Sequence, residues 1–206
     1  MTGRRLEALL DGAFGAAMLV TWIAPTLLGA GMLQVAITTF MLEFLVIHSA
    51  GFMAAAFNAS SNPRGRVRAL LVLACLYLLL AAGFAASMDD WWPLPAFALL
   101  LAGRIGIAWR HRSAAPEQAA VGGRQLMNDW VNSQVLYIPW VFAGLLLPWP
   151  PLGVTPEVVA AAGVPGTGEW VERPQTVLVA GAGYFLCRAW MQWRGRPLID
   201  VGRAPA

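Results

Sequence analysis

Long apolar runs constrain this chain more than any other feature. Nearly unbroken apolar sequence extends from Gly12 to Phe57, and further apolar stretches follow along the 206 residues. A helix needs about 20 such residues to cross a bilayer, because in lipid each backbone polar group must find its partner within its own segment. Membrane β-strands instead alternate over segments of about 10 residues, a pattern that these solid runs do not follow. The sequence therefore predicts an all-α, polytopic integral membrane helix bundle.

The composition supports the same class. Charged residues make up 12% of the chain and hydrophobic residues 58%, whereas soluble domains carry roughly 25% charged residues. This balance excludes an ordinary soluble domain and a disordered chain. With only two cysteines, Cys75 and Cys187, a disulfide-stapled secreted domain is also excluded, and we interpret both residues as small core hydrophobes.

Turn residues and charged groups divide the apolar sequence into six expected transmembrane helices within a single domain. Asn62-Pro63-Arg64-Gly65, Asp89-Asp90 and Gly122-Gly123 mark boundaries between them. A very tight outer turn around Gly29 and Gly31 separates the first two. The expected spans are 12–31, 32–57, 68–87, 92–110, 126–147 and 175–193.

The arginines predict the orientation. All 14 cationic side chains are Arg, and they lie in small groups between the apolar runs, unlike the continuous basic face that a nucleic acid requires. With both termini in the cytoplasm, the arginines that cluster at the ends of the apolar runs lie on the inner side, and the outer loops hold five acids with Arg173 as their one cation. This distribution obeys the positive-inside rule and predicts a multi-pass protein of the inner membrane. We interpret the N-terminal apolar stretch as an uncleaved first span, because it is longer than the core of a signal peptide.

Two loops are long enough to analyse. In the outer loop from Trp149 to Pro174, Thr155-Pro156-Glu157 resembles a helix start and Gly163 a helix stop, which predicts a short helix ending at Ala162. The inner loop from His111 to Arg124 has the small, polar composition of a flexible connector. We expect the outer loop to be a connector, with a lid over a pore as the alternative.

Polar side chains inside the spans are the candidate functional residues. Ionisable groups are expensive in lipid, so they face the bundle interior or water by default. Glu43 lies near the middle of the second span, and the other candidates fall on its cytoplasmic side. The expected substrate or ion pathway comprises Glu43, His48, Arg104, Asp129, Asn132 and Arg188. These depths predict a polar cavity that opens to the cytoplasm and ends near Glu43.

Helical spacing limits how these groups can pair. Glu43 and His48 are five residues apart, or about 140° around a helix, so they do not share a face. The expected counter-ion of Glu43 is Arg104, and this pair either handles a proton or substrate or only holds two helices together. A protonated Glu43 bonded to a backbone carbonyl is the competing state. Arg188 is close enough to the interface to extend its guanidinium out of the lipid.

The fifth span begins with a polar stripe. Gln125, Asn128, Asp129 and Asn132 recur at helical spacing. The stripe indicates either a water-filled vestibule or an ordinary interfacial helix start, and the sequence favours neither.

The chain lacks the sequence patterns of several functions. Its two histidines, His48 and His111, lie at different depths, so paired haem ligation is not expected. No metal-binding or nucleophile motif is present, and we expect no cofactor. Small residues on the first and last spans, including Gly12, Gly15 and Gly181, predict close packing of these helices or contact with another copy or a larger membrane complex.

The leading interpretation is a membrane protein that binds or translocates a small solute or ion, whose identity the sequence leaves unknown. Glu43 would titrate or pair, and His48 would relay a proton. The alternative is a non-transporting integral subunit or assembly factor, in which buried charges only hold helices together. A membrane-embedded enzyme using Glu43 and His48 comes third, because the two faces diverge.

Overall fold

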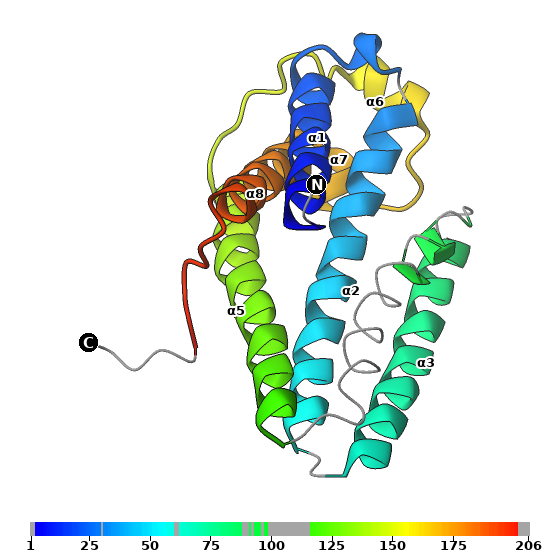
Figure 1. The fold of residues 1–206 in the computed structure, drawn as a ribbon. Helices are drawn as coiled ribbons and strands as arrows, with labels where there is room; N and C mark the ends of the chain where they lie inside the picture. The colour runs from blue at the N-terminus through cyan, green and yellow to red at the C-terminus, as the bar shows by residue number, and fades with distance from the viewer. Residues whose placement is uncertain are drawn as a thin grey trace. The chain divides into compact units, whose positions relative to one another are not determined.

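The computed structural model of the chain describes residues 3–29, 31–59, 62–87, 91, 93–95, 97–98 and 116–201. Regular secondary structure in these residues is helical throughout, which confirms the all-α prediction for this part of the chain (Figure 1). The elements are α1 (Gly3–Ile23), the short 3-10 helix η1 (Pro25–Leu27), α2 (Gly31–Ala59), α3 (Pro63–Ser87), α5 (Pro116–Leu146), α6 (Pro156–Ala162), α7 (Glu169–Glu172) and α8 (Gln175–Arg194).

Three of the described helices are long and apolar enough to cross a membrane. Their candidate spans are Arg5–Ile23 in α1, Gly31–Ala59 in α2 and Arg64–Ala86 in α3. The presence of apolar, membrane-type helices is thus supported, whereas the count of six spans and the orientation stay predictions. The expected fourth span, 92–110, lies largely outside the described residues.

Two helices match their expected spans at both ends, whereas α1, α3 and α5 each differ at one end or both. α2 and α8 agree with the expected second and sixth spans within two residues at each end. α1 ends at Ile23, eight residues before the expected end of the first span, because Pro25 cannot continue a helix and constrains Ala24 before it. The tight turn is therefore replaced by η1 and by Gly29, whose φ of 85° favours glycine.

α5 starts ten residues earlier than the expected fifth span. Pro116 occupies its first position, so residues 116–124 are helical and the prediction of a flexible connector there is wrong. Gly123 lies inside the helix, where a Cβ would collide with the side chain of Asn58 from α2. This glycine permits close helix approach rather than marking a boundary.

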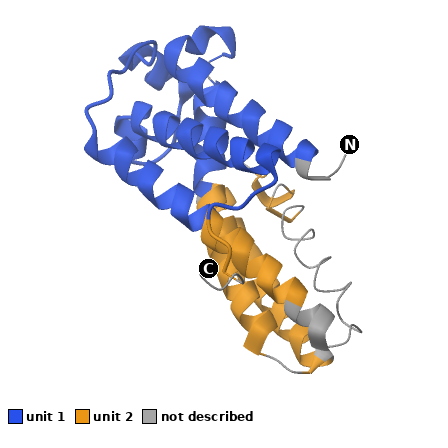
Figure 2. Ribbon diagram, turned by 60° about the vertical axis from the view of Figure 1, so that its left-hand side comes forward, with its two compact units in different colours: residues 1–41, 133–198 blue, residues 42–132, 199–206 orange. Residues whose placement is uncertain are grey.

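The described chain divides into two compact units, shown in blue and orange in Figure 2. Unit 1 comprises residues 1–41 and 133–198, and unit 2 comprises residues 42–132 and 199–206.

In unit 1, α1 packs along α8. A Cβ on Gly15 would lie 3.1 Å from the backbone nitrogen of Leu186, and one on Gly12 would lie 3.7 Å from the Cβ of Ala189. On α8, Gly181 similarly accommodates the sulfur of Met18. Small residues let the two helices approach closely, so of the two contacts predicted for them the structure shows the one between α1 and α8.

The loop from Trp149 to Pro174 closes over the end of α1 within the same unit. The indole of Trp22 donates a hydrogen bond to the carbonyl oxygen of Pro150 (2.8 Å), and its ring meets Trp149 edge-on. The expected short helix is present as α6, and it ends at Gly163 with a left-handed φ of 60°. Thr155 occupies the N-cap position, although its hydroxyl caps no backbone N–H. The local sequence signals of this helix were therefore sufficient to place it.

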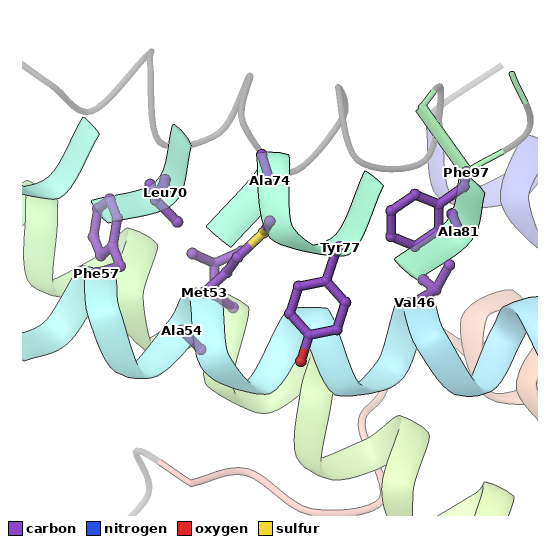
Figure 3. Packing of buried hydrophobic residues seen from close by; sticks show 10 residues of the cluster. Val46, Met53, Ala54, Phe57, Leu70, Ala74, Tyr77, Ala81 and Phe97 are labelled. Atoms are coloured by element: carbon purple, nitrogen blue, oxygen red, sulfur yellow. The ribbon is translucent and has the colours of Figure 1, made fainter. Parts of the chain in front are cut away.

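In unit 2, the buried core lies between α2 and α3, where apolar side chains interdigitate (Figure 3). Met53 and Phe57 from α2 pack against Leu70 and Ala74 from α3, and Phe97 covers one end. On the other side of α2, Gly51 leaves space for the indole of Trp130 from α5. These contacts fix the part of α2 that carries Glu43 and His48.

Candidate functional site

Glu43 is a carboxyl group within an apolar, buried stretch of α2. Its side chain is 7% exposed. Ile47 and Ala50, one and two turns farther along the same face, are also buried. Because water is largely absent there, the carboxyl must be stabilised by protein groups.

His48 lies on a different face of α2 from Glu43. Its imidazole packs on the ring of Phe44, an exposed residue one turn earlier, with 4.1 Å between ring centroids. The Nδ1 atom is buried and makes no hydrogen bond within the described part of the chain. The arrangement agrees with the helical spacing and offers no carboxylate–imidazole dyad.

Arg104, the expected counter-charge of Glu43, lies outside the described residues. The proposed Glu43–Arg104 pair therefore stays a prediction.

Arg188 forms an ion pair between α8 and α1 in unit 1. Its Nε lies 3.1 Å from Oδ2 of Asp11, and the two side chains are 22% and 13% exposed. One terminal nitrogen of Arg188 also donates a hydrogen bond to the hydroxyl of Tyr184 (3.1 Å). The guanidinium is thus engaged by two protein groups, beyond the interfacial role that the sequence suggested.

Sequence reasoning missed Asp11. The residue directly precedes the first expected span, so it was not counted among the intramembrane charges. A signal was present, because small residues already predicted contact between the first and last spans. Opposite charges on two helices predicted to touch are candidates for pairing.

An aromatic cluster surrounds Tyr184 and was also missed. Tyr137 stacks on Phe40 at 4.8 Å and meets Tyr184 edge-on at 5.3 Å. The Tyr137 hydroxyl donates to the backbone oxygen of Phe40 (3.2 Å), and Trp170 from α7 covers the Phe40 ring at 5.6 Å. Single aromatic residues within apolar runs form no sequence pattern that predicts contact between them.

In unit 2, two residues of the polar stripe of α5, Asn128 and Asn132, contact residues 199–201. These residues follow α8 and are called the C-terminal segment below. Asn132, only 2% exposed, donates to the carbonyl oxygen of Ile199 (2.8 Å) and accepts from the N–H of the same residue (2.9 Å). One turn earlier, Asn128 accepts from the N–H of Val201 (2.7 Å) and donates to the Asp200 carboxylate (3.2 Å). Asp129, between the two asparagines in sequence, is exposed.

No group of three or more His, Cys, Asp or Glu side chains in the described residues could hold a metal ion. Both cysteines are free thiols. Cys75 is exposed on α3, so its prediction as a core residue is wrong, because that position faces away from the α2–α3 core.

Comparisons of the chain with models of protein families, with curated proteins and with solved structures give no match.

Proposed function

We propose that the chain is a multi-pass membrane protein that binds or translocates a small solute or ion through a polar cavity open to the cytoplasm. The observation that carries this proposal is the burial of the Glu43 carboxyl, at 7% exposure, within a 29-residue apolar helix. A carboxyl at such a position costs several kcal/mol in lipid, a cost that proteins commonly retain for function. Its chemistry suits a proton or a small cation.

The other candidate residues take different parts in this proposal. Arg188 holds α8 to α1 through Asp11, and Asn132 holds the C-terminal segment. The ligand-handling groups are then Glu43 and His48, with Arg104 as counter-charge and Asp129 near the cytoplasmic entrance. His48 would act as a separate proton relay rather than as a direct partner of Glu43.

A second candidate is a non-transporting integral subunit or assembly factor. The Arg188–Asp11 ion pair favours it, because here an intramembrane charge serves packing between two helices. If Glu43 plays the same structural part, its loss would lower the amount of folded protein rather than a transport rate.

The test compares Glu43→Gln with the wild type and with Glu7→Gln, a control that neutralises an exposed acid on α1. Each full-length protein is placed in lipid nanodiscs, and thermal unfolding is followed at constant ionic strength while choline is exchanged for Na⁺ or K⁺, and as a function of pH. A ligand at 100 times its dissociation constant stabilises the bound fold by about 2.7 kcal/mol.

We expect the wild type and the Glu7 variant to gain stability with one of these probes and Glu43→Gln to gain none while remaining folded. A wild type that responds to no probe, or a Glu43→Gln protein that responds normally, would contradict the proposal. Reduced stability of Glu43→Gln combined with an unresponsive wild type would favour the structural subunit.

A further inference from the structure

The C-terminal segment is attached to α5 through its backbone. Asn132 binds both the N–H and the carbonyl oxygen of Ile199, and Asn128 binds the N–H of Val201. The side chains of Ile199 and Val201 are exposed, so their burial does not hold the segment in place. The Asp200 carboxylate adds a side-chain contact, because it accepts a hydrogen bond from Asn128 at 3.2 Å.

The spacing of the two asparagines matches the repeat of an extended chain. Four helical residues rise about 6 Å, whereas two residues of an extended strand advance about 6.6 Å. Alternate N–H groups of an extended segment point to the same side. Asn132 and Asn128 can therefore engage residues 199 and 201 in succession, with the segment running antiparallel to α5.

The side chain of Asn132 is suited to binding the backbone of a single residue. Its amide presents one donor and one acceptor side by side, the complement of the C=O and N–H of a single residue. The same amide also donates to the backbone oxygen of Asn128 (2.7 Å), which fixes its orientation. With the segment bound, the Asn132 side chain is 2% exposed, so its bonds to Ile199 satisfy polar atoms that water does not reach.

We propose that Asn128 and Asn132 form a binding site on α5 for an extended polypeptide backbone, and that residues 199–201 are its intramolecular, exchangeable ligand. The site binds main-chain N–H and C=O groups, so it accepts most side chains at positions 199 and 201. Release of the segment exposes the polar stripe of α5, so the site acts as a latch on that helix. This inference does not depend on the function of Glu43.

The test is hydrogen exchange of the Ile199 and Val201 amides in the full-length protein in nanodiscs. We expect Asn132→Leu to increase exchange at Ile199 by about fivefold or more, as befits the loss of a net hydrogen bond, and Asn128→Leu to do so at Val201. Gln125→Leu, an equivalent change at an exposed position of the same helix, should leave both amides protected. Unchanged protection in both asparagine variants would overturn the proposal.

Substitutions in the segment separate backbone recognition from side-chain packing. Ile199→Ala and Val201→Ala should keep the segment bound, whereas Val201→Pro removes one N–H and should release it while leaving α5 and α8 protected. The proline variant lies outside every helix, so it serves if Asn132→Leu does not fold. Release by either alanine variant would mean that side chains hold the segment.

A competing peptide tests whether residues 199–201 can be displaced from α5. An excess of a capped peptide spanning residues 196–201 should accelerate exchange at Ile199 and Val201 of the intact protein. A peptide with prolines at positions 199 and 201 should have no effect. Equal results with the two peptides would refute an exchangeable backbone site.

Discussion

The Arg188–Asp11 ion pair gives the most direct test of how partly buried charges stabilise unit 1. Replacing Arg188 by Met keeps a long apolar stem but leaves the Asp11 carboxyl in a site where it is only 13% exposed. Removing one partner of a buried pair costs about 3–5 kcal/mol. Since Arg188 retains 22% exposure, partial screening reduces the expected loss to about 2–3 kcal/mol of unfolding free energy.

The double variant Asp11→Leu/Arg188→Met should recover most of this loss. With both charges gone, this contact holds no unpaired ionised group, and apolar side chains of similar volume can fill it. We expect the double variant to lie within about 1 kcal/mol of the wild type, a strongly non-additive result for a contacting pair.

The assay is reversible unfolding in mixed micelles with increasing denaturing detergent, followed by tryptophan fluorescence. Glu169→Gln provides the control, because it breaks the exposed Glu169–Arg173 pair, whose side chains are 46% and 43% exposed. That change should cost at most about 1 kcal/mol. Additive single-variant effects, or an Arg188→Met protein as stable as the wild type, would refute the assignment of a helix-locking role.

Two further predictions concern packing and the loop from Trp149 to Pro174. Gly183→Ala places a Cβ against the indole of Trp140 and should lower stability by about 1–3 kcal/mol in the same unfolding assay, whereas Gly83→Ala, where a Cβ meets nothing within 4 Å, should cost nothing. A hydrogen bond from Thr155 lowers the pKa of the Glu157 carboxyl. Its contribution to stability is therefore present at neutral pH and is lost as pH falls through the lowered pKa. Thr155→Val should raise that pKa in an NMR titration of the Glu157 carboxyl, and an unchanged titration would contradict the assignment.

The sequence predicted the features that depend on local composition. The helical class and the bounds of α2 and α8 follow from uninterrupted apolar runs, and α6 follows from Thr155-Pro156 and Gly163. The early end of α1 at Ile23 was missed because length was given more weight than the helix-breaking Pro25. The early start of α5 was missed because Gly122 and Gly123 were interpreted as a boundary, although Gly123 serves contact with α2.

The candidate site was predictable only in part. Burial of Glu43 and its separation from His48 follow from position and from the 100° step of a helix. The partner of Arg188 required knowing which faces of α1 and α8 meet, and the partner of Asn132 required the path of the chain after α8. Neither partner can be inferred from the sequence next to Arg188 or Asn132.

The sequence by itself determined that this chain forms apolar helices suited to a membrane, because backbone hydrogen bonding in lipid leaves few alternatives to an apolar run. It also identified the polar residues that interrupt the apolar runs. Only the tertiary structure decided that Arg188 meets Asp11 and that Asn132 meets Ile199. These pairings depend on contacts between segments far apart in the chain, and hydropathy, which describes each segment separately, carries no information about them.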